Sequence, residues 1–286
     1  MHRDTRPCNE PGGAGVLLQA VVDSTRKARM NRLGTVVALM TALVVVGAPR
    51  AASAPSGSGS PVVIAHGSAR GFVGNHGDEV SANWAGYAAT GATFTDVVGS
   101  WTEPTPTCSG KVQYAAFWVG IDGFSSGDTA ELEQVGTDAD CTKKGPNYYA
   151  WWQMLPAISR NFSRTSCPVG SGDAMTAEVS NAGGRFTLSI TDTTRGWTCA
   201  SPTETSSAPG LSAEWVVEDP SANATGRLLK LADFGTVNFT GAAADGSSLS
   251  ALSTAKITMQ VKRTVKAVTT PIFPDGGSFG VTWQHS

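Results

Sequence analysis

The chain is built from short runs of β-forming residues that turn residues interrupt. No segment of ten or more residues carries a convincing 3.6-residue apolar period with helix caps. Many short strands without crossover helices predict an all-β fold, an antiparallel β-sandwich of the concanavalin-like or jelly-roll type with two packed, curved sheets. The expected strands cover residues 83–87, 94–98, 99–102, 112–119, 148–154, 174–179, 186–191, 211–217, 236–239, 257–261 and 279–283.

The first 54 residues read as a leader. Basic residues within 25–30 precede an apolar run over 33–48, and an Ala-Ser-Ala tripeptide follows at 52–54. A basic region, an apolar core and an Ala-x-Ala ending describe a secretory signal peptide. The run of 16 residues is short for a membrane span. We therefore interpret 1–54 as an N-terminal extension plus signal peptide, and expect a secreted, extracellular protein.

Residues 55–80 are rich in Gly, Ser and Pro, with one apolar patch at 62–64. They are interpreted as a linker or short pro-segment that adds little to any core. Residues 81–286 suit a single domain with 13 Lys and Arg against 18 Asp and Glu, a net charge of about −5. Such a surface offers no basic patch for nucleic acid or an anionic membrane. We expect a monomer that binds neither.

Four cysteines fall in the predicted domain: Cys108, Cys141, Cys167 and Cys199. An even number in an oxidising compartment indicates two disulfides, and four cysteines allow three connectivities. We favour the local pairing, Cys108 with Cys141 and Cys167 with Cys199, although the sequence leaves the alternatives open.

The histidines exclude several chemistries. They are His2, His66, His76 and His285, so the predicted domain has none before its penultimate residue. This argues against Ser-His-Asp and Cys-His catalysis and against His-rich zinc sites. Phosphate-binding and dinucleotide motifs are also missing, and we expect neither a metal nor a cofactor. Any catalysis therefore falls to carboxylates and amides.

Two side chains stand out by their phase on predicted strands. Along 211–217, Glu214 shares a face with Val216, so this carboxylate is either a functional group or an exposed surface charge. Along 131–136, Gln134 shares a face with Leu132, whereas Glu131 and Glu133 point the other way. An inward amide needs hydrogen-bond partners, and a buried structural amide is the simpler interpretation.

Several collinear motifs resemble the glutamic peptidases, also called eqolisins or family G1, secreted acid proteases of fungi that also occur in bacteria. We expect a secreted member of the bacterial type. The resemblance spans about 81–240 and weakens after 242. It rests on residues 83–86 (Asn-Trp-Ala-Gly), 98–104, 117–123 (Phe-Trp-Val-Gly-Ile-Asp-Gly), 132–136 (Leu-Glu-Gln-Val-Gly), 149–153, 213–219 (Ala-Glu-Trp-Val-Val-Glu-Asp) and 232–237.

The resemblance implies a secreted acid endopeptidase with a catalytic dyad of Gln134 and Glu214. It also implies that Trp118, Asp122 and Trp151 line or support the substrate cleft. The chain departs from the fungal pattern beside the last of these tryptophans. Where fungal members carry acids, it has Tyr149 and Gln153. The pH dependence of activity is therefore expected to differ.

Two other functions compete with this interpretation. A glycosidase on a lectin-like sandwich could use two of Glu131, Glu133, Glu214 and Glu218 as its acid and base. A non-catalytic carbohydrate- or protein-binding sandwich is the second, since abundant tryptophan suits sugar stacking as well as a core. The pair Glu218 and Asp219, next to Pro220, is expected to be a solvated strand end.

Overall fold

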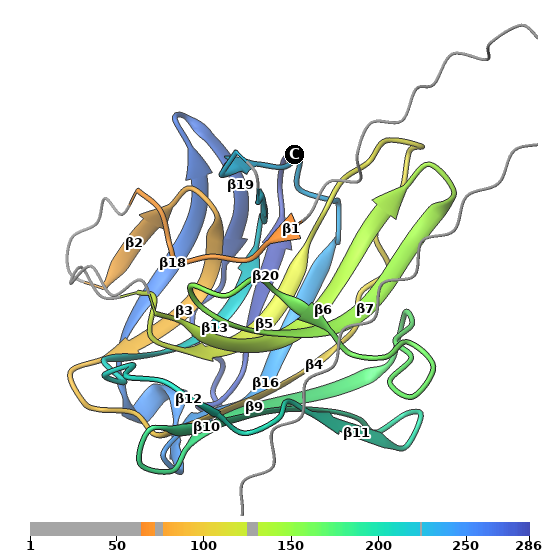
Figure 1. Ribbon diagram of the computed structural model, residues 1–286. Helices are drawn as coiled ribbons and strands as arrows, with labels where there is room; N and C mark the ends of the chain where they lie inside the picture. Colours follow the sequence, from red (N-terminus) through yellow and green to blue (C-terminus); the bar gives the residue numbers. More distant parts are fainter. Residues whose placement is uncertain (1–63, 72–76, 125–130, 224) are drawn as a thin grey trace, which may run out of the picture. The chain divides into compact units, whose positions relative to one another are not determined.

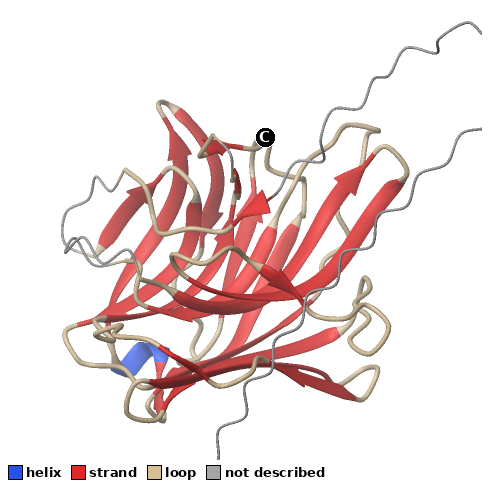
Figure 2. Cartoon of the chain, in the orientation of Figure 1, coloured by secondary structure: helices blue, strands red, loops and turns tan. Residues whose placement is uncertain are grey.

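The computed structural model describes residues 64–71, 77–124, 131–223 and 225–286. The predicted signal peptide and residues 55–63 and 72–76 of the predicted linker lie outside these ranges. In the described part, strands make up almost all of the regular structure, and the only helix is a short 3-10 turn, Leu249–Ala251 (Figure 2). None of the described helices is long and apolar enough to cross a membrane.

The strands form a two-layer antiparallel sandwich, as the sequence predicts (Figure 1). We call one layer the front sheet. Its strand order is β8-β7-β6-β5-β13-β3-β18, and β2 adds to β18 in parallel. The bounds are β2 Asp78–Ser81, β3 Trp84–Thr90, β5 Ala116–Ile121, β6 Glu133–Thr142, β7 Gly145–Met154, β8 Arg160–Asn161, β13 Ser212–Glu218 and β18 Ser253–Val261.

The other layer, the back sheet, has the order β20-β16-β4-β9-β10, with β11 and β12 along the far edge of β10. Strand β19 pairs with both β18 and β20 and so joins the two layers at one edge. The bounds are β4 Asp96–Thr102, β9 Ala174–Asn181, β10 Arg185–Asp192, β11 Trp197–Ala200, β12 Glu204–Thr205, β16 Thr236–Ala244, β17 Ser247–Ser248, β19 Thr264–Thr269 and β20 Phe279–Trp283.

The main core lies between the layers and follows from alternation along each strand. On β13, Ala213, Trp215 and Val217 enter this core, whereas Val216 belongs to a second apolar cluster on the outer face of the front sheet. Trp215 also donates from Nε1 to the carbonyl oxygen of Val98, 2.7 Å away in the back sheet. The outer face therefore carries the alternate residues, and Glu214 is among them.

Several strand predictions differ from the structure. The two strands expected over 94–98 and 99–102 form a single strand, Asp96–Thr102. The strand expected over 112–119 is Ala116–Ile121, because Gln113 and Tyr114 make only single bridges, to Cys141 and Leu231. The strand Thr264–Thr269 was not predicted, although it is needed to join the two sheets.

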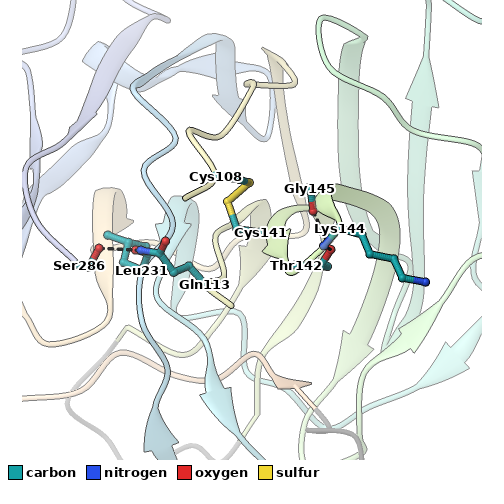
Figure 3. Close-up of a disulfide and its surroundings, with 8 residues drawn as sticks. All are labelled: Cys108, Gln113, Cys141, Thr142, Lys144, Gly145, Leu231 and Ser286. Carbon is teal, nitrogen blue, oxygen red and sulfur yellow. Dashed lines mark hydrogen bonds between the residues drawn. A yellow bond between two sulfur atoms is a disulfide. The ribbon is translucent and has the colours of Figure 1, made fainter. Parts of the chain in front are cut away.

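Both disulfides have the local pairing that we favoured, Cys108–Cys141 and Cys167–Cys199. The first ties the loop after β4 to the end of β6 (Figure 3). Beside it, Gln113 donates from Nε2 to the carbonyl oxygen of Leu231 at 3.1 Å and to Oγ of Ser286 at 2.8 Å. Gln113 also exchanges two backbone hydrogen bonds with Cys141. The end of the strand that carries Gln134 is therefore linked to the loop after β4 by the disulfide and, through Gln113, to Leu231 and Ser286.

Residues 64–71 and 77–80 contradict the expectation that residues 55–80 add little to any core. The strand β1, Ile64–Ala65, pairs with β14, Ser221–Ala222, which in turn pairs with β15, Arg227–Leu228. From β1 the chain passes in front of the front sheet (orange in Figure 1), and Ile64 and Ala69 pack on the outer apolar cluster. His66 is 2 % exposed.

Candidate active site

The strand register arranges the outer face of the front sheet in rows. Residues opposite one another on neighbouring strands project from the same face, and so do residues two positions apart on one strand. The first row reads Glu214, Gly120, Gln134 and Gln153; the second Val216, Trp118, Gly136 and Trp151; and the third Glu218, Ala116, Asp138 and Tyr149.

Gln134 and Glu214 lie in the same row with Gly120 between them. Gly120 adds no side chain of its own to the row between the amide and the carboxyl group. The position is also tightly enclosed, since a Cβ there would lie 2.9 Å from the Trp118 ring and 3.1 Å from the carbonyl oxygen of Glu133. The two predicted catalytic residues are therefore brought into one row, and the glycine between them leaves room for the Trp118 ring and for Leu132.

Both side chains of this pair are fully buried. Burial raises the pKa of Glu214 well above its ordinary value, and the carboxylates of Asp122 and Glu133 raise it further. A side-chain hydrogen bond from Ser212 lowers the pKa and offsets part of this rise. Gln134 donates from Nε2 to Oε1 of Gln153 at 3.4 Å. Its own Oε1 is buried with no hydrogen-bond partner among the described residues. The row thus combines a carboxyl group that resists ionisation with an amide oxygen left free.

Asp122 supports the site from outside these rows. It has a left-handed backbone conformation with φ of 70°, and its carboxylate accepts from the backbone N–H groups of Gly210 and Leu211 at 2.8 and 2.7 Å. Its own N–H donates to the carbonyl oxygen of Ser212 at 2.9 Å. Asp122 therefore fixes the start of β13, two residues before Glu214.

Two tryptophans hold carboxylates on the same face. Trp118 donates from Nε1 to Oε2 of Glu218 at 3.0 Å, and Trp151 donates from Nε1 to Oδ1 of Asp138 at 2.6 Å. Burial raises the pKa of Glu218 to about 8. The expected solvated strand end at Glu218 and Asp219 is wrong, since these residues are 1 % and 0 % exposed. β13 ends at Glu218, whose Oε1 accepts from the backbone N–H of Gly67, and the carboxylate of Asp219 pairs with Lys266.

Residues 64–71, which we call the covering segment, place His66 against these groups. Its ring stacks on Trp151 with centroids 3.6 Å apart and an interplanar angle of 3°. Nε2 lies 3.7 Å from Oδ1 of Asp138, and Nδ1 lies 3.6 Å from Oε2 of Glu218. Burial lowers the pKa of His66, although Asp138 acts in the opposite direction. At neutral pH the imidazole is therefore a neutral ring seated on an aromatic surface.

Backbone contacts hold the rest of this segment. The carbonyl oxygen of Gly67 accepts a hydrogen bond from Nε1 of Trp84, and the N–H of Gly67 donates to Oε1 of Glu218, both at 2.9 Å. Ala69 donates its N–H to the carbonyl oxygen of Gly123 at 3.3 Å. The segment thus lies across the face that carries Gln134 and Glu214. A cavity of 420 Å³ remains between residues 65–70, Gln153 and residues 155–158.

In the described part of the chain, no group of three or more His, Cys, Asp or Glu side chains is placed to hold a metal ion.

Comparison with known proteins identifies the family. The model of the Peptidase A4 family matches residues 82–283. The chain belongs to the Peptidase A4 family. It is 32 % identical over 200 residues to Aspergillopepsin-2 of Aspergillus niger, covering 60 % of this chain and 67 % of that protein.

Two solved structures of family members share the fold. Scytalido-glutamic peptidase, crystallised with a transition state analog inhibitor, superposes with a TM-score of 0.62 at 22 % identity, over 71 % of this chain and 98 % of its own. Aspergilloglutamic peptidase from Aspergillus niger superposes with a TM-score of 0.51 at 26 % identity, over 60 % of this chain and 99 % of its own. This Peptidase A4 chain is therefore a glutamic-type peptidase that acts on polypeptides, which decides against the glycosidase and the non-catalytic binding module.

Three residues of the face are not predicted to lie there from the sequence, in which Glu218 is interpreted as a solvated strand end. Glu218 follows Glu214 by four positions, so the alternation that selected Glu214 would have selected it too. Asp138 follows Gln134 by the same interval on β6. His66 had a weaker signal, the apolar patch at 62–64 in an otherwise small and polar stretch.

Proposed function

We propose that this glutamic peptidase is a secreted endopeptidase that works in acid with Gln134 and Glu214 as its catalytic dyad. The observation that carries the proposal is the register that sets these two side chains on either side of Gly120. The leader at 1–54 and the two disulfides support export into an oxidising compartment.

The dyad supplies the parts that peptide hydrolysis needs. Ionised Glu214 takes a proton from a water molecule as the water oxygen bonds to the carbonyl carbon of the substrate. An N–H of Gln134 donates to the oxyanion that forms, and its Oε1 orients the water. The protonated Glu214 then returns the proton to the amide nitrogen as the C–N bond breaks. The products are a carboxylic acid and an amine, and Glu214 is again ionised.

We also propose that residues 55–80 act as a pro-segment, of which 64–71 lie across the face that carries Gln134 and Glu214. Catalysis needs a peptide on the outer face of the front sheet, and that face is occupied by His66 and its neighbours. Release of this segment also admits water, which brings the pKa of Glu214 down towards the acid range where a general base must ionise. The covered form is then latent.

The test is cleavage of a denatured protein at pH 3 to 7 by the full chain, with mass spectrometry of its N-terminus at each time point. Glu214→Gln and Gln134→Ala are compared with the wild type after circular dichroism shows that all three are folded. We expect cleavage in acid by the wild type and a loss of at least about 10²-fold in each variant. A folded Glu214→Gln protein that cleaves at the wild-type rate would refute the dyad.

A further inference from the structure

Gln153 belongs to a chain of hydrogen bonds that has only one possible direction. Its Nε2 donates to the carbonyl oxygen of Ala157 at 2.8 Å, and its Oε1 accepts from Nε2 of Gln134 at 3.4 Å. A backbone carbonyl can only accept, so Gln153 must turn its NH₂ group towards Ala157. The oxygen of Gln153 is then left for Gln134, and this oxygen also can only accept. Gln134 must therefore turn its NH₂ group towards Gln153.

This direction decides what Gln134 presents to the rest of the row. Gln153 lies on one side of it, on β7, and Gly120 followed by Glu214 lies on the other. With the NH₂ group turned towards β7, Oε1 is left on the side of Gly120 and Glu214, where it is buried without a described partner. One N–H is used by Gln153, and the second stays available.

We propose that Gln153 is a positioning residue that fixes the amide of Gln134 with its oxygen towards Glu214 and one N–H free for the substrate oxyanion. The inference rests on the proposed role of Gln134 in the dyad. Free rotation of the amide would exchange oxygen and nitrogen at the two places and put a donor where the water needs an acceptor. Gln153 is itself 2 % exposed, so solvent does not compete for its amide.

An uncharged residue at 153 also keeps this orientation independent of pH. An ionised Glu could not donate to the carbonyl oxygen of Ala157, and only its protonated form could replace both bonds of Gln153. The charged and titratable neighbours of the position are His66 and Arg70, which line the same cavity, and Glu214 across Gly120. We therefore expect Gln153 to extend activity towards higher pH than Glu would allow.

The experiment compares Gln153→Met and Gln153→Glu with the wild type, all as the full chain processed in acid, using a fluorogenic peptide from pH 3 to 7. Gln153→Met should lower kcat by about 10- to 100-fold with a small change in KM and an unchanged shape of the pH profile. Gln153→Glu should keep activity at the acid end and lose it at a lower pH than the wild type does. The matched control is Gln260→Met, because Gln260 also donates from Nε2 to a backbone carbonyl, that of Lys262, at 2.8 Å but at a distant hairpin.

A second readout does not depend on activity. The side-chain NH₂ of Gln134, assigned by its loss in Gln134→Glu, should give one slowly exchanging proton by NMR in the wild type and in Gln260→Met. In Gln153→Met both protons should exchange fast. Unchanged exchange, or a Gln153→Met enzyme with wild-type kcat, overturns the positioning role. A wild type that is inactive but shows the protected proton instead refutes the proposed function and leaves the hydrogen-bond chain standing.

Discussion

His66 lies flat on Trp151, with ring centroids 3.6 Å apart, and its two ring nitrogens face Asp138 and Glu218. These two residues belong to parts of the chain that the sequence assigns to different roles, a small-residue linker and an aromatic strand. Their contact seats the covering segment on the face that carries the proposed dyad, Gln134 and Glu214. Replacing a residue of this contact can therefore test whether the covering segment keeps the unprocessed chain inactive.

Replacing His66 with Ala should loosen the covering segment. The variant loses the stacked ring, which contributes about 0.5–1.5 kcal/mol beyond its buried area in aromatic pairs. We expect the unprocessed chain to cleave a small peptide several-fold faster than the wild type, measured as an initial rate while mass spectrometry shows an intact N-terminus. Ser68→Ala, in the same segment, is the control and should behave like the wild type. Equal rates for all three proteins would show that the segment does not block the dyad.

Replacing Gly120 with Ala should damage activity more than folding. The added Cβ would approach the Trp118 ring, Leu132 Cδ1 and the carbonyl oxygen of Glu133 to between 2.9 and 3.1 Å, so the row must shift. We expect about 1–3 kcal/mol lower free energy of unfolding and about 10²-fold lower kcat/KM. Urea denaturation and peptide hydrolysis measure the two effects. Gly277→Ala, where a Cβ meets only atoms at 3.6 Å or more, should change neither. A Gly120→Ala enzyme with full activity would contradict the role of Gly120 in aligning the row.

The fold should be more stable in acid than at alkaline pH. Burial raises the pKa of Glu103 and Glu218 to about 8, and of Glu133 and Asp219 to about 7. These groups hold protons in the folded state at pH values where the unfolded chain has released them. Their contribution is therefore complete below the ordinary carboxyl pKa and is lost as pH rises through about 7 to 8. His66 has the opposite effect on stability: burial lowers its pKa, so its contribution to stability is lost as pH falls.

Thermal unfolding at pH 5, 7 and 8.5 tests this expectation, with Tm falling by several degrees over the series. Glu103→Gln should flatten the dependence, since this side chain is 1 % exposed and needs no ionisation to accept from Thr137 and Trp101. Glu204→Gln, in a partly exposed strand, serves as the control. A Tm that rises with pH would contradict the assignment.

The two disulfides should differ in their effect on activity but not on stability. Their sequence separations are 33 and 32 residues, so the loop-closure entropy predicts a similar loss of about 3–4 kcal/mol for each pair replaced by Ser. Cys108–Cys141 fixes the end of β6, the strand of Gln134, whereas Cys167–Cys199 lies beside the back sheet. We expect the kcat of the Cys108/Cys141 double variant to fall by more than its unfolded fraction explains. The kcat of the Cys167/Cys199 double variant should fall only by its unfolded fraction. Equal kcat in both folded variants would argue against this link.

The sequence by itself determined the fold class and, through its resemblance to the glutamic peptidases, the two residues that we propose as the dyad. Strand alternation depends only on the chirality and pleat of the backbone, so Glu214 could be grouped with Val216 and Gln134 with Leu132. Alternation did not show that this shared face is the outer face of the front sheet, where the amide was expected to point inward. The same count would have reached Glu218 and Asp138. Turn residues and β-formers likewise located β20 at its observed bounds, Phe279–Trp283.

Only the tertiary structure decided how these faces meet and what covers them. Alternation assigns a residue to a face but does not fix the register between strands far apart in the chain, and this register is what puts Gly120 between Gln134 and Glu214. The place of His66 was hidden for a similar reason. Its seat is formed by Trp151, Asp138 and Glu218, which come from three strands, so nothing local to residues 64–71 encodes it. A segment that gains its order from long-range contacts reads as a linker until those contacts are seen.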